Sequence, residues 1–239
     1  MKKLIIVALT VLLSACQTTS SNTQAELEQL KAEIVQLKHV QALVAQKIGL
    51  GALVRPDEIS IIDGQRVGSD SATIVLLEFT DLHCPFCAKY HKTVWPQLKT
   101  DYVDTGKVLF VGKELPLSKL HPKAAYAAVA LRCAAKQGSY TDAKNALFEK
   151  GAQLKGSDLE DIIVDNNLDK TNFDACLKNV SIHNKITNSL LDAKKLGFAS
   201  TPTFVIGKRQ GNVIIDYEVV NGAGSVENFT AIFDRLLAE

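Results

Sequence analysis

The sequence has no excess of either charge. Its 239 residues include 27 Lys and Arg against 26 Asp and Glu, for a formal net charge of +1. A general nucleic-acid binder neutralises many phosphates and therefore needs a basic surplus or a basic face, and no basic run is present. Disorder as the main state is also excluded, because 46% of the residues are hydrophobic and only 22% are charged. We expect one substantial domain with an extension.

The N-terminal apolar run, residues 4–13, is too short to span a bilayer as a helix. It follows two lysines, as in the core of an export signal. It ends in Leu13-Ser14-Ala15-Cys16, which resembles a bacterial lipobox, where cleavage before the cysteine leaves the thiol carrying lipid. A conventional signal peptidase site prefers a smaller residue than Leu13. We expect a signal peptide over residues 1–15 and lipidation of Cys16, with a plain secretory signal as the alternative.

The resemblance to lipoproteins implies a location in the bacterial cell envelope. Several acyl chains on Cys16 would anchor the protein durably, facing the periplasm. Gln17 stands where an aspartate is associated with retention in the inner membrane, so the resemblance favours the outer membrane. Residues 16–23 are polar without apolar periodicity and are expected to form a flexible tether.

Residues 24–54 are expected to form a helical stalk. Apolar residues alternate in steps of three and four, as at the a and d positions of a coiled coil, interrupted by Gln41. These residues are Leu27, Leu30, Ile34, Leu37, Val44 and Ile48. In a parallel coiled coil Glu26 would face Lys31, and Glu33 would face Lys38. We expect self-association through residues 24–50, as a dimer or a trimer. The alternative is a single amphipathic helix packed on its own domain.

Residues 55–239 are expected to form an α/β domain. Strands are predicted at 59–62, 73–79, 108–111, 203–206 and 213–220, and a Gly/Ser/Asp-rich turn follows the first of them. Helices are predicted for an Ala-rich stretch ending at 137, and then for 142–150, 158–166, 172–178 and 182–195. A terminal helix is predicted after Ser225, which can cap it.

Cys84-Pro85-Phe86-Cys87 follows a predicted central strand and opens a predicted helix. Free backbone N–H groups and the helix dipole favour a thiolate at the first position, so Cys84 is the expected nucleophile. Pro85 fits the first helical position, where its missing donor costs nothing. Cys87, one turn inward, is placed to attack the mixed disulfide and release the substrate.

A C-x-x-C pair has two other interpretations. It can be half of a metal site, here with His83 or His91 as further ligands, but structural zinc sites usually show a second close Cys/His pair. It can be a purely structural disulfide, but so short a loop closes almost no chain entropy. The redox interpretation is therefore preferred, and no cofactor or resident metal is expected.

The order of elements resembles the thioredoxin fold, and specifically its DsbA-like branch, in which a helical domain is inserted before a cis-proline. The matching phrases are residues 78–81 before the C-x-x-C pair, 104–108 after its helix, and 197–204 near the end. Similar proteins include exported suppressors of copper sensitivity and 27 kDa outer-membrane antigens. The resemblance covers residues 68–239 and implies a helical insert near 116–196.

The resemblance implies roles for residues around the cysteine pair. Pro202 would be cis and face the two sulfurs, and the Thr201 backbone would pair with an extended substrate peptide. The expected substrate-contacting residues are His83, Pro85, Phe86, Thr201 and Pro202.

Two titratable residues near the pair have expected roles in proton transfer. Glu78 would be partly buried and could move the Cys87 proton, with a solvated carboxylate as the alternative. His83, if charged, would stabilise the Cys84 thiolate.

Cys133 and Cys176 remain after one lipidated and two redox cysteines are counted. They lie in separate predicted helices of the insert, and in an exported protein we expect them to form a disulfide. Buried free thiols are the alternative.

The sequence therefore predicts an enzyme: an envelope thiol-disulfide oxidoreductase acting on cysteine-containing exported proteins, together with a membrane redox partner. The stalk slightly favours an isomerase or reductase, because several active sites facing one another could hold a misfolded client, and Thr201 before the proline resembles the isomerase branch. The DsbA-like architecture favours a disulfide-donating oxidase. Two other classes stay open: a copper- or metal-handling envelope protein with Cys84, Cys87 and a histidine as ligands, and a passive scaffold.

Overall fold

The computed structural model describes residues 2–48, 50 and 54–239, and the chain divides into two compact units at Arg55 and Pro56. The first unit contains one continuous helix, α1 (Lys2–Lys47). Residues 16–23 belong to this helix, where the sequence favours a flexible tether. No glycine or proline occurs between residues 2 and 47, so no strong helix breaker interrupts it.

The lipidation predicted at Cys16 lies outside the described residues, because side chains are described only from residue 23 onward. In the described part of the chain, no helix combines the length and apolar character that a membrane span needs.

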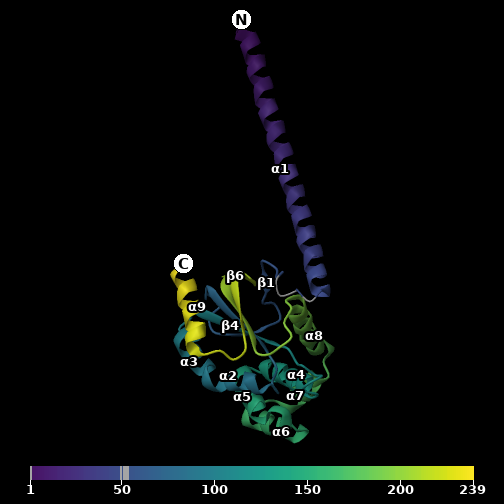
Figure 1. The fold of residues 1–239 in the computed structure, drawn as a ribbon, viewed down its shortest axis with the longest axis vertical. Helices are drawn as coiled ribbons and strands as arrows, with labels where there is room; N and C mark the ends of the chain where they lie inside the picture. Colours follow the sequence, from purple (N-terminus) through teal and green to yellow (C-terminus); the bar gives the residue numbers. More distant parts are fainter. Residues whose placement is uncertain (1, 49, 51–53) are drawn as a thin grey trace. The chain divides into compact units, whose positions relative to one another are not determined.

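The second unit is built on a six-stranded mixed sheet with the strand order β1-β6-β5-β3-β4-β2 (Figure 1). The strands are β1 (Ile59–Ser60), β2 (Gln65–Val67), β3 (Ile74–Thr80), β4 (Val108–Glu114), β5 (Thr203–Gln210) and β6 (Val213–Asn221). The central strand β3 pairs in parallel with β4 and antiparallel with β5. The five strands predicted from the sequence are present. Strand β2 was predicted as part of a turn, because three residues are too few to show a period.

Helices cover both faces of this sheet. They include α2 (Pro85–Thr93), α3 (Trp95–Leu98), a π-helical turn η2 (Lys99–Val103), α8 (Val180–Lys195) and α9 (Val226–Ala238). Side chains of β3 alternate between the two faces, and all seven residues are buried. Ile74 and Leu76 join a core under α2, α3 and α9, whereas Val75 and Leu77 join a core under α8. Figure 1 shows α9 and α8 on opposite sides of the strands.

The inserted helices form a third core beyond the ends of the strands (Figure 1). They are α4 (Ala124–Ala135), α5 (Tyr140–Lys150), a short 3-10 turn η3 (Gly151–Gln153), α6 (Gly156–Asp165) and α7 (Lys170–Leu177). Cys133 in α4 and Cys176 in α7 form a disulfide with an S–S distance of 2.08 Å, which confirms the predicted pairing.

Buried ion pairs connect the sheet to the helices around it. Arg132 of α4 donates from Nε to Glu114 of β4 at 2.8 Å. Lys113 of β4 donates from Nζ to Asp192 of α8, also at 2.8 Å. Both cations are almost fully buried. Such pairs position the elements they join, because an unpaired buried charge is strongly destabilising.

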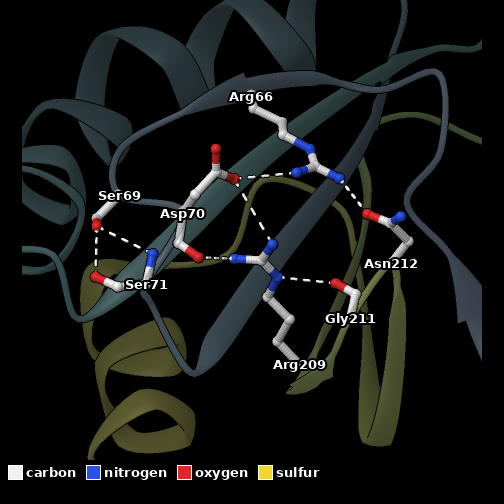
Figure 2. Close-up of polar contacts among 7 residues, drawn as sticks. All are labelled: Arg66, Ser69, Asp70, Ser71, Arg209, Gly211 and Asn212. Atoms are coloured by element: carbon white, nitrogen blue, oxygen red, sulfur yellow. Dashed lines mark hydrogen bonds and ion pairs between the residues drawn. The ribbon is translucent and has the colours of Figure 1, made fainter.

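A second polar cluster lies at the end of β3 remote from the cysteines (Figure 2). Arg66 of β2 donates from Nη1 to the Asp70 carboxylate at 3.0 Å and from Nη2 to Asn212 at 2.7 Å. Arg209 of β5 donates to the Asp70 carbonyl and lies 3.6 Å from its carboxylate. These contacts tie the turn before β3 to the β5–β6 hairpin. Because Asp70 is exposed, these ion pairs add little to the stability of the fold, and their main effect is to position the turn against the hairpin.

Removing the Cys133–Cys176 disulfide should destabilise the fold. Replacing both cysteines by Ala is expected to lower the free energy of unfolding by about 4 kcal/mol, because a cross-link over 43 residues restricts the unfolded chain by that amount in the chain-entropy model. Guanidinium denaturation followed by circular dichroism measures the loss. The Cys84→Ala/Cys87→Ala variant, which leaves this disulfide intact, is the matched control. Equal stability of the two double variants would contradict the prediction.

Candidate active site

The cysteine pair opens α2, as the sequence predicts. Cys84 is the N-cap residue with an extended backbone, and the helix begins at Pro85. Both Cys84 and Cys87 are free thiols. Cys84 is 6% exposed and Cys87 is fully buried, so only the first sulfur borders the surface.

The two thiols have opposite acidities. The pKa of Cys84 is lowered to about 5, first by the hydrogen bond from Cys87, then by the Thr201 side chain and by backbone N–H groups at the start of α2, against the opposing effect of burial. The pKa of Cys87 is raised, first by burial, then by its hydrogen bond to Cys84 and by the negative charge of Glu78. At neutral pH, Cys84 is therefore a thiolate and Cys87 a thiol, which is the asymmetry that a nucleophile and a resolving cysteine require.

A cis peptide bond joins Thr201 to Pro202, directly before β5. Cys84 Sγ lies 3.3 Å from the Thr201 carbonyl oxygen, to which it donates only in its protonated form, although 117 residues separate the two in sequence. The pairing of β5 with β3 brings them together, because β3 leads to Cys84 and β5 follows Pro202. The prediction of a cis-proline beside the sulfurs is thus confirmed.

The surface beside the cysteines is partly apolar. Pro85 and Phe86 are exposed, and Phe86 is 62% exposed. Thr201 and Pro202 are buried.

His83 is also buried, and burial is the main cause that lowers its pKa. Its ring is therefore neutral at neutral pH, so the hypothesis of a cationic His83 beside Cys84 is not supported. The loop that carries it is held by Asp81, whose carboxylate accepts hydrogen bonds from the backbone N–H groups of His83 and Leu117, both at 2.8 Å. Asp81 also lies 2.9 Å from His121 Nδ1.

Glu78, predicted to be partly buried, is fully buried beneath the pair. Its carboxylate accepts a hydrogen bond from Lys144 Nζ at 2.6 Å, and His91 Nε2 lies 3.3 Å away. Burial, the largest influence, raises the pKa of Glu78, but Lys144 and His91 together outweigh it and lower the pKa to about 2. Glu78 is therefore ionised at neutral pH, and the alternative of a solvated carboxylate is excluded.

Sequence reasoning missed Lys144 and Asp81 as site residues, and considered His91 only as a metal ligand. Lys144 lies in α5, 66 residues from Glu78, and its ammonium group lies over the Phe110 ring. The available signal was weak: Lys144 falls beside Ala143 on the buried face of a helix whose one other lysine, Lys150, is more exposed.

The comparisons with known proteins agree with this fold. A family model described as "Thioredoxin" matches residues 61–234, so the chain belongs to the thioredoxin family. The crystal structure of Wolbachia pipientis alpha-DsbA1 is 27% identical, with a TM-score of 0.65, and the match covers 78% of this chain and 94% of that one. The fold is therefore the DsbA-like thioredoxin fold.

Curated relatives are longer than the matched region. A Rickettsia conorii protein named, provisionally, as a protein-disulfide oxidoreductase is 29% identical over 63% of this chain and 56% of its own length. A Mycobacterium Na(+)/H(+) antiporter, NhaA 1, is 32% identical over 69% of this chain and 26% of its own length. The chain thus spans about a quarter to just over half of these relatives.

The acidity of Cys84 can be measured directly. The rate of Cys84 alkylation in the reduced protein, scored by peptide mass spectrometry, should rise with pH with a midpoint near pH 5. Cys87→Ala should move this midpoint upward, because it removes the hydrogen bond that lowers the pKa most. Cys87→Ser, which keeps a donor, is the matched control and should move it less. A wild-type midpoint near that of an ordinary thiol, about pH 8.5, would contradict the assignment.

Proposed function

We propose that this protein is an envelope thiol-disulfide oxidoreductase that acts on exported proteins through a mixed disulfide at Cys84. The observation that carries the proposal is the pairing of a low-pKa thiol with a buried high-pKa thiol beside a cis-proline. Buried structural cysteines lack this asymmetry. The names of the Rickettsia and Wolbachia relatives support the same class of activity.

The exchange proceeds in two displacements. The Cys84 thiolate attacks a client disulfide, forming a Cys84–client bond and releasing one client thiolate, which takes a proton. Cys87 then loses its proton and attacks the Cys84 sulfur, which releases the second client thiolate. The client disulfide has been reduced to two thiols, and the Cys84–Cys87 pair has been oxidised. The reverse sequence donates a disulfide to the client.

Client recognition is proposed to rest on the backbone. The Thr201 carbonyl lies at the Cys84 sulfur, so an extended peptide attached to that sulfur would pass beside the cis-proline segment. Exposed Pro85 and Phe86 offer apolar contact without demanding one particular side chain. His83 would act through the shape of the loop, since its ring is buried. Broad specificity for cysteine-containing exported proteins follows.

Self-association through residues 24–50 is proposed from the surface of α1. Every apolar residue of the a/d seam is exposed in the single chain, from 46% for Leu27 to 68% for Leu37. Lys31 forms an ion pair with Glu28 of its own helix, and both side chains are exposed. Because an exposed ion pair contributes little free energy, Lys31 can leave Glu28 and pair with Glu26 of a second copy. A second copy of the chain is the occupant that both the apolar spacing and the charges fit. Lipidation of Cys16 would hold this assembly at the outer membrane, facing the periplasm.

The direction of exchange has support on both sides. Several active sites joined by a stalk could hold one misfolded client, which favours an isomerase or reductase, served by a membrane redox partner that keeps the pair reduced. The low pKa of Cys84 favours the oxidase, because a stabilised thiolate is a good leaving group and makes the disulfide more oxidising. We propose the isomerase or reductase, with the oxidase as the second candidate.

The reduction potential of the Cys84/Cys87 pair distinguishes these directions. Equilibration in glutathione buffers, followed by alkylation and mass spectrometry, scores the pair separately from Cys133 and Cys176. The isomerase predicts a pair found reduced in the envelope, together with reshuffling of scrambled substrate. A strongly oxidising potential with slow reshuffling would favour the oxidase. A pair that fails to exchange would overturn the redox function, and tight Cu(I) binding by the same thiols would then favour the metal-handling class.

The stalk has its own test. Ile34→Glu, in the seam, should convert the oligomer into a monomer and abolish isomerase activity while leaving reduction of glutathione disulfide unchanged. Val35→Glu is the matched control, because Val35 is 67% exposed but lies outside the seam. Light scattering after size-exclusion chromatography measures the mass. A wild-type monomer, or an oligomer indifferent to Ile34→Glu, would refute the coiled coil.

A further inference from the structure

A groove of about 610 Å³ lies between the active-site helix and the insert, and no step of the proposed exchange uses it. One wall comes from α2 and α3 and includes Ala88 and Trp95, and the other comes from α5 and includes Asn145 and Phe148. The two helices α2 and α5 lie side by side (Figure 1), with the rings of His91 and Phe148 4.7 Å apart. The volume falls within the range of about 300 to 1,000 Å³ that is usual for ligand sites in proteins.

The side chains around the groove suit a polypeptide. Trp95, Pro96 and Phe148 give it apolar surface. Thr141 and Asn145 add a hydroxyl and an amide that have no hydrogen-bond partner among the described residues. Such groups both donate and accept, as the backbone of an extended peptide requires.

The charged side chains at the groove have opposite signs. Lys92 belongs to α2 and Glu149 to α5, and both are exposed. Lys99 also lines the groove, but its ammonium group already pairs with Asp104 at 2.7 Å. A strongly charged ligand of either sign is therefore not favoured, whereas an apolar side chain on a neutral backbone is.

The groove begins one helical turn from the nucleophile. The Ala88 backbone N–H donates to the Cys84 carbonyl at 3.1 Å, so these two residues lie on the same side of α2. Lys92 follows Ala88 by four positions and Trp95 follows Lys92 by three, which keeps all of them on one stripe of the helix surface. This stripe leads from Cys84 into the groove.

The groove and the cis-proline lie on opposite sides of Cys84. Strand β3 leads to Cys84 and has β5 on one side and β4 on the other. Pro202 directly precedes β5. Helix α5 lies over β4, because Lys144 Nζ is 4.9 Å from the centroid of the Phe110 ring. A chain attached to the Cys84 sulfur can therefore pass beside Thr201 on one side and enter the groove on the other.

The length of helix between the nucleophile and the groove sets a spacing. At a rise of about 1.5 Å per residue, Ala88 lies about 6 Å and Trp95 about 16 Å from Cys84 along the helix axis. An extended chain covers about 3.3 Å per residue, so this interval corresponds to positions about two to five residues from a cysteine bound to Cys84.

We propose that the groove binds an apolar side chain of the client, about two to five residues from the client cysteine, an inference that rests on the redox function proposed above. The occupant is an extended segment of the same polypeptide that is attached to Cys84. Trp95 and Phe148 contact its apolar side chain, and Asn145 and Thr141 form hydrogen bonds with its backbone.

This contact selects a class of client. Large apolar side chains are mostly buried in folded proteins, so a segment that offers one beside a reactive cysteine belongs to an unfolded or misfolded chain. The groove demands an apolar residue within an interval and not a particular sequence. It therefore adds a preference for non-native clients to the broad specificity proposed for the cis-proline segment.

Disulfide exchange at equilibrium tests the proposal in the full-length protein carrying Cys87→Ala, which cannot resolve the adduct. Its Cys84–glutathione mixed disulfide is incubated with short Gly/Ser peptides that contain one cysteine and one leucine. The peptide thiolate attacks the Cys84 sulfur, a Cys84–peptide bond forms, and glutathione leaves as a thiolate that takes a proton. Mass spectrometry gives the ratio of the two adducts. The leucine is moved stepwise along the peptide on either side of the cysteine, and a peptide without leucine is the reference.

The adduct ratio should be about tenfold above the reference when leucine stands about two to five positions from the cysteine, on one side only. Asn145→Trp should abolish this maximum, because the larger side chain fills the groove. Asp142→Trp is the matched control and should keep the maximum, because Asp142 is also exposed on α5 but does not line the groove.

Several results would overturn the proposal. One is a ratio that does not depend on the position of leucine, and others are a maximum that survives Asn145→Trp or that is lost equally in Asp142→Trp. A maximum that disappears as the protein concentration rises would assign the groove to a second copy of the chain. The peptide series decides even if Asn145→Trp does not fold. Failure of Cys84 to form an adduct with glutathione or with any peptide would instead refute the proposed function.

Discussion

The buried carboxylate of Glu78 is the charge around which the active site and the inserted helices are arranged. It lies on the central strand, directly before the redox loop, with no exposed surface. Burying a carboxylate costs several kcal/mol unless a well-placed cation compensates it. Lys144 of α5 supplies that cation at 2.6 Å, so the insert must sit at one position relative to the sheet for the charge to be tolerated.

The same charge separates the chemistry of two cysteines that are only three positions apart. Cys84 caps a helix and is stabilised as a thiolate by hydrogen bonds, whereas Cys87 lies inside the protein, where burial and the negative charge of Glu78 keep it protonated. The helix start explains part of the acidity of the first thiol, and the hydrogen bond from Cys87 explains more of it. The second depends on a charge held in place by another part of the chain.

Three buried cations in the described residues share one arrangement, in which each joins the sheet to a helix between β4 and β5. Arg132 and Lys144 reach from helices to strands, and Lys113 reaches from a strand to a helix. The Cys133–Cys176 disulfide joins two helices of the insert to each other and does not connect the insert to the sheet. The ion pairs make that connection. The insert is therefore braced internally by a covalent bond and positioned on the sheet by electrostatics.

Local pattern in the sequence determined the strands, the helices of the insert, the C-x-x-C pair at a helix start and, through resemblance, the cis-proline beside it. These features depend on residues that are close in sequence, because apolar spacing and helix capping do not require tertiary contacts. The cysteine count and the expected export together favoured the disulfide over buried free thiols, and the structure contains it. Only the tertiary structure decided that Glu78 is ionised, that Lys144 and His91 are its partners, that Asp81 braces the loop and that residues 65–67 form an edge strand. A lysine on a helix has no local signal that distinguishes a solvated side chain from a buried one, because burial depends on residues that are distant in sequence.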